Sequence, residues 1–364
     1  MNLSQQTFLD LLVDVDSKST NHNFYTFKKE DDGYLSPMQM ASLYTNSALL
    51  VTIMGFLKEQ LWLKNKEDKE LGEETSYENF ITPYFIKELQ PILFLKDFLV
   101  KSGSKKIKEI ERKSKSIEDK ALSLITSRSA SDQKYFAIES LKTMTQYFID
   151  EESEQEGKLT GDAHRGLRLY RTFDGLDEIF NFNYQLDKEL IVDHSIKERL
   201  FEGAGVGVQS GYSTILLALN HIDSKHGAKI IDLGSGYGRV GLVCSLLRPD
   251  IEFVGYEYVT HRVDVGNISK SFLGLEKSLD FKTQDLSLES FRIPNADVYY
   301  MYDPFTKETY EYVLKQIVEL SKIKKVVIVT KGNARSWLVD ISKENSWPKP
   351  EFIDEGNLCI FSSC

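Results

Sequence analysis

Cysteine is scarce in this chain of 364 residues, which has only Cys244, Cys359 and Cys364. The three share no metal-ligand spacing, and an odd, sparse set argues against a framework of disulfides. Such a set is typical of a protein in a reducing compartment, so we expect a cytoplasmic location. Histidine is also scarce, with six residues that form no metal spacing, and we therefore expect no metal site.

An excess of positive charge is also missing, because 45 Lys and Arg residues face 55 Asp and Glu residues, for a net charge of -10. Nucleic-acid binders normally carry a basic field, so we do not expect nucleic acid as a partner, although a local basic patch is still compatible with this charge. Residues 1–16, MNLSQQTFLDLLVDVD, lack the basic start and long apolar run of a signal peptide. The most apolar stretch, ALLVTIMGFL at 48–57, is too short to span a bilayer. We therefore expect no membrane partner and interpret this stretch as one face of a buried helix.

The first half of the chain shows helical periodicity, with apolar residues recurring every three or four positions. The predicted helices cover 36–67, 83–101 with a break near Pro91, 105–125 and 132–152. The first begins with Ser36-Pro37, a pair suited to a helix cap and first turn, and the polar run 151–166 is interpreted as a loop. Residues 1–185 are thus predicted to form an α-helical domain that covers the site or selects the substrate.

Residues 105–115 hold many basic side chains within the third predicted helix. They could bind phosphate. Interleaved acids and isoleucines at helical spacing favour a solvated helix face instead.

Short β-rich runs dominate the second half of the chain. They lie at 228–234, 251–258, 279–286, 296–304, 324–332, 350–356 and 357–364. Helical stretches between the first five predict a parallel sheet with helices on both faces. The last two runs leave room only for the turn DEGN, which predicts an antiparallel hairpin at the sheet edge. Residues 186–364 are therefore predicted to form a doubly wound α/β domain.

A turn rich in glycine follows the first of these runs. The stretch IIDLGSGYGRVGL at 230–242 places Asp232 and then glycines 234, 236 and 238 between a strand and a helix. Glycines let a ligand approach the backbone, and parallel sheets bind ligands at the carboxyl ends of their strands. The spacing is G-x-G-x-G, whereas dinucleotide domains use G-x-G-x-x-G. An acid before the turn repels a pyrophosphate and suits a cationic ligand, although a tight turn without any ligand would show the same pattern.

Glu257 ends the next β-rich run. A carboxylate there can accept hydrogen bonds from both ribose hydroxyls of a nucleoside. Domains that bind NAD use the same device, so Glu257 supports a nucleoside without choosing among cofactors. A solvated glutamate at a strand end is the alternative interpretation.

The pattern of strand, acid and glycines at 230–238 resembles motif I of class I S-adenosylmethionine-dependent methyltransferases. The resemblance implies a Rossmann-like methyltransferase sheet and S-adenosylmethionine (SAM) as the cofactor, which carries a sulfonium and an ammonium and no phosphate. It also implies that Asp232 and the turn face the methionine part, and that Asp285 lies near the adenine. The implied cofactor-binding residues are Asp232, Gly234, Ser235, Gly236, Gly238, Glu257, Asp285 and Leu286.

The fourth β-rich run ends in Asp303-Pro304-Phe305. This tripeptide resembles the [DN]-P-P-[YF] motif of amino-group methyltransferases, with one proline fewer. In that family the polar side chain aims the acceptor amine for in-line displacement, which requires alignment and an unprotonated nucleophile, and the aromatic ring packs on the substrate. The resemblance implies an amine-type acceptor positioned by these three residues. A plain turn with a core phenylalanine is the alternative.

Residues 201–219, FEGAGVGVQSGYSTILLAL, precede the glycine turn. With Tyr212, the turn and Glu257 in this order, residues 200–335 resemble DOT1-like methyltransferases and their bacterial relatives. The resemblance implies that Tyr212 closes over the methyl-transfer channel and that the acceptor is a protein side chain, whose identity it does not fix. Those enzymes usually begin the fourth-strand motif with Asn, where this chain has Asp303.

Two other classes of protein stay open. An NAD(P)-dependent oxidoreductase would need a turn compatible with pyrophosphate. A non-catalytic nucleoside-binding protein would keep the fold without the chemistry. Within the enzyme class, transfer of an aminopropyl group from SAM is a further alternative.

Overall fold

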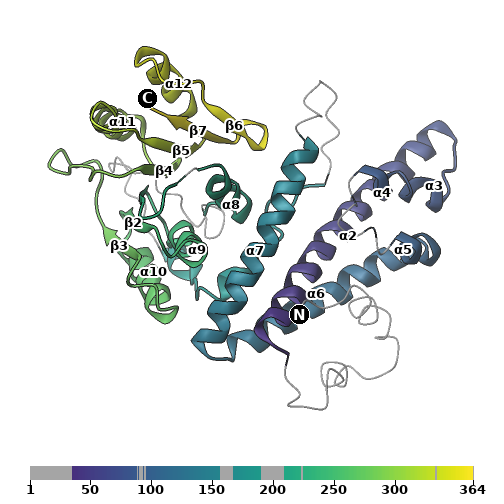
Figure 1. The fold of residues 1–364 in the computed structure, drawn as a ribbon. Helices are drawn as coiled ribbons and strands as arrows, with labels where there is room; N and C mark the ends of the chain where they lie inside the picture. Colours follow the sequence, from purple (N-terminus) through teal and green to yellow (C-terminus); the bar gives the residue numbers. More distant parts are fainter. Residues whose placement is uncertain are drawn as a thin grey trace. The chain divides into compact units, whose positions relative to one another are not determined.

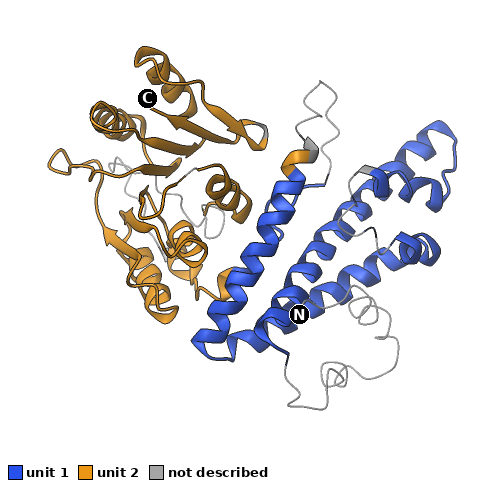
Figure 2. Ribbon diagram, in the orientation of Figure 1, with its two compact units in different colours: residues 1–151, 160–176 blue, residues 152–159, 177–364 orange. Residues whose placement is uncertain are grey.

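A computed structural model describes residues 35–87, 89, 93, 96–155, 167–189, 209–222, 224–332 and 334–363. The chain divides into two compact units, Met1–Glu151 with Thr160–Leu176 and Glu152–Leu159 with Asp177–Cys364 (Figure 2). Residues 177–185, which the sequence assigns to the helical domain, are grouped here with the second unit.

The first unit consists of helices. Their bounds are α2 Pro37–Leu71, α3 Tyr77–Ile81, α4 Tyr84–Lys87, α5 Lys96–Ser102, α6 Lys105–Thr126 and α7 Ala130–Gln155, the last of which runs past the end of this unit. The predicted start of the first helix is confirmed, because the Ser36 hydroxyl accepts the Gln39 backbone N–H at 3.3 Å while the Gln39 side chain accepts the Ser36 N–H at 2.9 Å. Pro91, where a break was predicted, lies outside the described residues.

Helix α2 contains the most apolar stretch of the chain and packs along α6 (Figure 1). Its buried residues include Leu49, Leu50, Ile53 and Leu57, so the stretch is one face of a buried helix, as predicted. By length and composition alone α2 is long and apolar enough to cross a membrane, but 67% of its apolar window is buried inside the structure. A core helix of a helical unit has these same properties.

The second unit contains one sheet of seven strands, in the order β3-β2-β1-β4-β5-β7-β6 (Figure 1). The strands are β1 Lys229–Leu233, β2 Glu252–Glu257, β3 Leu279–Thr283, β4 Val298–Tyr302, β5 Val327–Lys331, β6 Glu351–Ile353 and β7 Leu358–Ser362. Strands β1 to β5 pair in parallel, whereas β7 pairs antiparallel with both β5 and β6. The second unit is thus an α/β fold whose mixed sheet ends in an antiparallel hairpin.

Helices lie on both faces of this sheet. They are α8 Tyr212–His221, α9 Arg239–Leu247, α10 Thr260–Phe272, α11 Lys307–Ser321 and α12 Ala334–Glu344. Short 3-10 turns also occur at Tyr184–Glu189 and Asp354–Gly356, and at Asp174–Glu178 where the chain passes from the first unit to the second. Side chains alternate along a strand, so Ile231 and Leu233 of β1 point to one face, where they join a hydrophobic cluster with α11 and α12. Phe253 of β2 points to the other face and lies against Gly241 of α9.

The connection between β3 and β4 differs from the prediction. The sequence predicts a helix there, but residues 284–297 form turns without one. Asp285 accepts the backbone N–H of Ser287 at 2.9 Å, and such a local turn competes with helical hydrogen bonding. Pro294 has no N–H to donate, and its carbonyl accepts the Tyr299 hydroxyl at 2.9 Å. Both features disfavour a helix in this connection.

Candidate functional site

The glycine turn joins β1 to α9 at the carboxyl edge of the sheet. Gly234, Gly236 and Gly238 have φ angles of +89°, +56° and +87°, a left-handed backbone that side chains rarely adopt. A Cβ atom on Gly238 would overlap the ring of Phe281, and one on Gly234 would overlap the side chain of Pro304. Glycine is therefore required here by backbone conformation and by close neighbours.

Four backbone N–H groups of the turn already have acceptors within the chain. Those of Gly234 and Ser235 donate to the Tyr256 carbonyl at 2.8 and 2.9 Å, and that of Gly238 donates to the Ser235 carbonyl at 2.9 Å. The N–H of Gly236 donates to Oε2 of Glu257 at 2.8 Å. A phosphate-binding turn presents its N–H groups to the ligand. With these four engaged, this turn offers little to a pyrophosphate.

Asp232 and Glu257 form a buried pair of acids beside the turn, 2% and 6% exposed. Among the described residues Oδ2 of Asp232 has no hydrogen-bond partner. Burial raises the pKa of the Asp232 carboxyl well above its usual range, and the neighbouring Glu257 carboxylate raises this pKa further. An ionised Asp232 is thus costly in this position unless a cation or a hydrogen-bond donor reaches it.

Neighbouring groups of the chain fix the position of the Glu257 carboxylate. Its Oε1 accepts the Val259 backbone N–H at 3.0 Å and lies 3.7 Å from the Arg262 guanidinium. A carboxylate offers about four acceptor positions. The backbone bonds use two of them, so Glu257 retains acceptor capacity for a ligand hydroxyl while its position is fixed.

Asp187, in the turn Tyr184–Glu189, was not predicted as a site residue. It is fully buried and accepts Nε of Arg262 at 3.0 Å, with Nε2 of His261 also 3.0 Å from the same oxygen. Because Arg262 in turn lies beside Glu257, this network extends the charged cluster at the end of β2. No pattern near residue 187 signals the role, since its partners come from α10.

A second network, which no motif in the sequence indicates, surrounds Arg239, the first residue of α9. The guanidinium is 1% exposed and donates to the carboxylate of Asp177, which also accepts the hydroxyls of Tyr184 and Tyr212 at 2.7 Å each. Arg239 also lies 4.7 Å above the Tyr212 ring. The Tyr212 side chain is 1% exposed and engaged on its ring and its hydroxyl. As placed, it anchors α8, and a closing role over a channel would require it to leave these partners.

Residues 209–211 cross the carboxyl edge of the sheet just before α8. The Ser210 carbonyl accepts from Arg239 at 3.0 Å, and the Ser210 hydroxyl bonds the Tyr300 hydroxyl of β4 at 3.1 Å. The Gln209 amide lies directly over Gly236, where an added Cβ atom would be 3.0 Å from Oε1. Gln209 therefore borders the glycine turn, a position that no motif in the sequence indicates.

The tripeptide 303–305 follows β4. Asp303 has a φ of +48° and packs against Gly332, whose added Cβ atom would lie 2.9 Å from the Cβ of Asp303. Pro304 contacts Gly234, so the structure brings the fourth strand end and the glycine turn together, as predicted. Phe305, by contrast, is 2% exposed and packs on Tyr310 at a centroid distance of 5.2 Å. In this structure it belongs to the hydrophobic core.

Asp285 and Leu286 lie two and three residues beyond β3. The Gln284 N–H donates to the Glu257 carbonyl at 2.8 Å, so this loop joins the same edge of the sheet. Oδ1 of Asp285 accepts the Ser287 hydroxyl at 2.6 Å as well as its N–H. Leu286 is 1% exposed within the hydrophobic cluster. Of these two residues, Asp285 offers polar atoms at this edge of the sheet, whereas Leu286 packs in the core.

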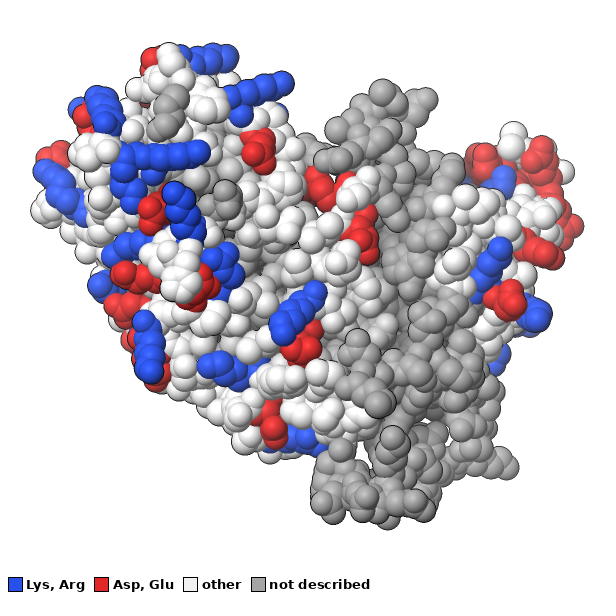
Figure 3. Space-filling view, viewed as in Figure 1, with Lys and Arg blue, Asp and Glu red and all other residues white. Residues whose placement is uncertain are grey.

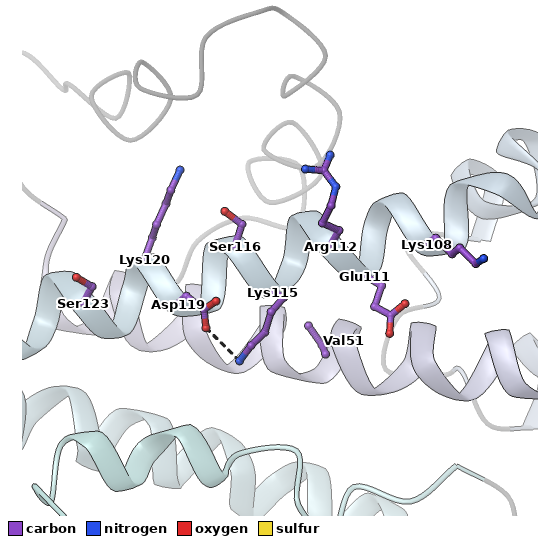
Figure 4. A pocket seen from close by; sticks show the side chains of 9 residues that line it. All are labelled: Val51, Lys108, Glu111, Arg112, Lys115, Ser116, Asp119, Lys120 and Ser123. Atoms are coloured by element: carbon purple, nitrogen blue, oxygen red, sulfur yellow. Dashed lines mark ion pairs between the residues drawn. The ribbon is translucent and has the colours of Figure 1, made fainter.

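The basic run of α6 borders a shallow groove in the first unit, which Figure 4 shows from close by. Lys115 lies 3.1 Å from Asp119 and 3.0 Å from Glu118, and Glu111 lies 2.6 Å from Lys58. Acids thus accompany the cations along this helix. The groove is not a convincing phosphate site, in agreement with the interpretation of this run as a solvated helix face.

Metal and thiol chemistry find no support in the described ranges. No cluster of His, Cys, Asp and Glu there could hold a metal ion. Cys244 is buried, and burial raises the pKa of its thiol to about 12, so it would not act as a nucleophile at neutral pH.

Neither a protein-family model nor a curated protein sequence matches this chain. Solved structures that resemble part of it include precorrin-6y C5,15-methyltransferase from Geobacter metallireducens GS-15, at 12% identity and a TM-score of 0.34 over 43% of this chain and 90% of that one. TrmN from Thermus thermophilus has 15% identity and a TM-score of 0.35 over 42% of this chain and 48% of TrmN, so the match spans about half of TrmN. A SAM-dependent O-methyltransferase from Thermotoga maritima has 16% identity and a TM-score of 0.32, over 41% and 63%. With such low scores these likenesses assign no activity, which has to come from the site itself.

Proposed function

We propose that the second unit is a SAM-dependent methyltransferase. One observation carries the proposal: the carboxylate of Asp232 is buried beside Glu257, with an oxygen that has no partner among the described residues. The neighbouring glycine turn has four of its N–H groups already donated within the chain. An acidic, donor-poor site favours a cationic nucleoside over a dinucleotide.

The residues at this edge of the sheet fit SAM. Asp232 would accept the cofactor's ammonium, and Glu257, with acceptor positions still available, would accept ribose hydroxyls. Asp285 would lie toward the adenine amino group. When bound, SAM supplies an electrophilic methyl group on a sulfonium. The chain contributes the alignment of the acceptor and the exclusion of water.

Asp303 is the residue we assign to the acceptor. It follows β4 in a left-handed conformation that costs a non-glycine residue energy, and such strain often marks functional positions. Pro304 holds this loop against the cofactor turn through Gly234. The Asp303 carboxylate would accept a hydrogen bond from the acceptor amine and orient its lone pair. Phe305 is left out of this role because it is buried.

The acceptor we favour is an amine on a protein side chain. The preference for protein rests on the DOT1-like resemblance, which is an analogy of sequence pattern. The visible surface of the second unit shows basic and acidic side chains interspersed (Figure 3). Its ion pairs include Lys324 with Asp297 at 2.6 Å and Lys229 with Glu252 at 2.9 Å. Cations paired in this way give little support for nucleic acid as the acceptor. We further propose that the helical unit selects the acceptor and that the protein acts in the cytoplasm.

Transfer of labelled methyl from SAM tests this function. The purified chain is incubated with the labelled cofactor and a total cell extract, which is then separated into protein, nucleic-acid and small-molecule fractions. We expect label on amine nitrogens of the protein fraction, lost in Asp232→Asn and kept in Asp264→Asn, which alters an exposed acid of α10. Label only in nucleic acid would overturn the proposed acceptor, and no enzyme-dependent label in any fraction would argue against methyl transfer.

A further inference from the structure

Asp232 and Glu257 share a buried site but differ in the donors that reach them. Glu257 accepts the backbone N–H groups of Gly236 at 2.8 Å and Val259 at 3.0 Å. Its Oε1 also lies 3.7 Å from Nη1 of Arg262. Oδ2 of Asp232, in contrast, is buried without a hydrogen-bond partner among the described residues. Donors and a cation thus stabilise a negative charge on Glu257, and Asp232 lacks this support at Oδ2.

The pair therefore favours one negative charge over two. Two carboxylates buried side by side do not both ionise readily, because each charge disfavours the other and water is excluded. The difference in donors assigns the proton of the cofactor-free pair to Asp232. Burial and the charge of Glu257 act in the same direction, since both raise the pKa of the Asp232 carboxyl. A cation that pairs with Asp232 has to displace this proton.

The elements packed around β1 carry further charged and titratable groups. They are Tyr212 on α8, Tyr237 in the glycine turn, Arg239 on α9, His261 and Arg262 on α10, Tyr300 on β4, Asp303 after β4, and Asp177, Tyr184 and Asp187 in the 3-10 turns. Arg239 donates to Asp177, whereas His261 and Arg262 both contact Asp187. These cations are thus engaged by other acids. The ammonium of a ligand is the cation that Asp232 would meet.

We propose that this site exchanges ions: Asp232 holds a proton in the cofactor-free protein and releases it to solvent as it accepts the ammonium of the cofactor's amino-acid end. One proton leaves and one ammonium enters, so the net charge of the buried site stays the same. This inference rests on the proposed function and deepens it, because it makes cofactor affinity depend on pH. A nucleoside without an ammonium has nothing to exchange, and the proton then stays on Asp232.

The exchange has a definite dependence on pH. Between the pKa of Asp232 in the complex and its higher pKa in the cofactor-free protein, each bound cofactor releases one proton. Affinity then rises with pH by up to about tenfold per pH unit. Above the pKa of the cofactor-free protein Asp232 is already ionised, and this dependence disappears.

Calorimetric titrations of the full chain in two buffers of different ionisation enthalpy measure the proton release. The ligands are S-adenosylhomocysteine (SAH), which carries the ammonium, and 5′-methylthioadenosine, which keeps the nucleoside without the amino-acid end. Between about pH 5 and 7.5 we expect SAH to release about one proton at the acid end, with affinity that rises with pH. Methylthioadenosine should release none, and its affinity should change by less than about twofold over this range.

Two variants identify the group that releases the proton. Asp232→Asn resembles the protonated side chain, so it should bind methylthioadenosine within about twofold of the wild-type affinity and lose SAH binding. His261→Gln is the matched control, because histidine is the other type of side chain at this edge that changes charge near neutral pH. It should retain the proton release of the wild type. Loss of the release in His261→Gln would assign the proton to His261 and overturn the inference.

The outcomes separate the inference from the proposed function. SAH binding without proton release anywhere in this pH range would overturn the exchange and leave the cofactor assignment intact. Equal proton release by both ligands would also overturn it, since the release would not depend on the ammonium. Wild-type protein that binds neither ligand would overturn the proposed function and the exchange together. If Asp232→Asn fails to fold, the comparison of the two ligands on the wild-type chain still decides.

Discussion

The backbone N–H of Gly236 donates to the side chain of Glu257 at 2.8 Å. This bond joins the glycine turn after β1 to the acid at the end of β2, so the two predicted cofactor motifs form one unit. It fixes the Glu257 carboxylate without consuming all of its acceptor positions. A change in either residue should therefore disturb both the turn and the proposed ribose contact.

Gly236→Val should abolish cofactor binding. The φ of +56° is strained for a β-branched residue, and its Cβ atom would be 3.0 Å from the Gln209 amide. We expect an affinity for SAH reduced by at least about 100-fold in calorimetry, because the added side chain would distort the turn and displace Gln209. Gly274→Ala is the control, because Gly274 has a similar φ of +62° with nothing within 4 Å of its added Cβ atom. It should lower stability by about 1 kcal/mol and leave binding unchanged. If Gly236→Val and Gly274→Ala bound SAH with equal affinity, the cofactor would not bind at the glycine turn.

Asp232→Asn should stabilise the cofactor-free protein while it removes binding. The pKa of this buried carboxyl is raised in the folded state above its ordinary 3.8, so the folded chain keeps a proton that the unfolded chain releases. The stability this group contributes is full below the unfolded pKa and is lost as the pH rises through the folded pKa. Asparagine does not ionise, so at neutral pH we expect a free energy of unfolding higher by about 1–3 kcal/mol, with little difference in acid. Urea unfolding across pH measures this.

The control for the pH dependence is Asp264→Asn, which changes an exposed acid of α10. It should follow the wild-type profile at every pH. If the free energy of unfolding of Asp232→Asn also followed the wild-type dependence on pH, ionisation of Asp232 would not destabilise the folded chain as we predict.

Asp303→Ala should spare cofactor binding and reduce methyl transfer. The carboxylate is assigned to the acceptor amine, and loss of a group that orients or accepts a proton from the nucleophile typically costs about 100-fold or more in rate. Asp303→Asn keeps an acceptor oxygen and tolerates the φ of +48°, so it should restore part of the rate. Initial rates of labelled methyl transfer, with SAH affinity measured in parallel, check both expectations.

Asp354→Ala controls for the strain, because Asp354 has a φ of +50° in the turn between β6 and β7. Asp354→Ala should remove no contact at the site and should leave the rate of methyl transfer unchanged. If Asp303→Ala lost SAH affinity without a separate loss of transfer rate, Asp303 would contact the cofactor and not the acceptor.

Asp177→Ala should destabilise the second unit strongly, because it leaves the Arg239 guanidinium buried without its partner. Breaking a buried ion pair in this way typically costs about 3–5 kcal/mol. Asp174→Ala removes a partly exposed partner of Arg171 and should cost about 0–1 kcal/mol. Chemical unfolding of both variants measures the difference. Similar small losses would mean that the Arg239 network is not a structural anchor.

Features with a local signal in the sequence were the predictable ones. The cap at Ser36, the strands and the glycine turn are encoded by neighbouring residues, and the structure contains each of them. The hydrogen-bonded ion pair between Asp177 and Arg239 joins positions 62 residues apart, and no motif near either residue predicts it. Gln209 likewise borders the glycine turn only because the fold brings it over Gly236.

Phe305 shows the opposite case, in which a local motif suggests an aromatic ring available to a substrate and the fold buries that ring. The sequence places an aromatic residue after Asp303-Pro304, as in enzymes where that ring packs on the substrate. In the structure the ring is 2% exposed and packs on Tyr310 in the core. The direction of a side chain after a strand depends on the local backbone, which the left-handed conformation of Asp303 changes.

The most direct test of the account is a calorimetric titration of the wild-type chain with SAH and, separately, with NADH. A turn with four N–H groups engaged, beside two buried acids, should bind SAH and give no heat with NADH. Glu257→Ala should weaken the SAH interaction, because it removes the carboxylate that we propose for the ribose hydroxyls. Tight binding of NADH without binding of SAH would contradict the account at its centre, since it would require the glycine turn to hold a pyrophosphate next to Asp232.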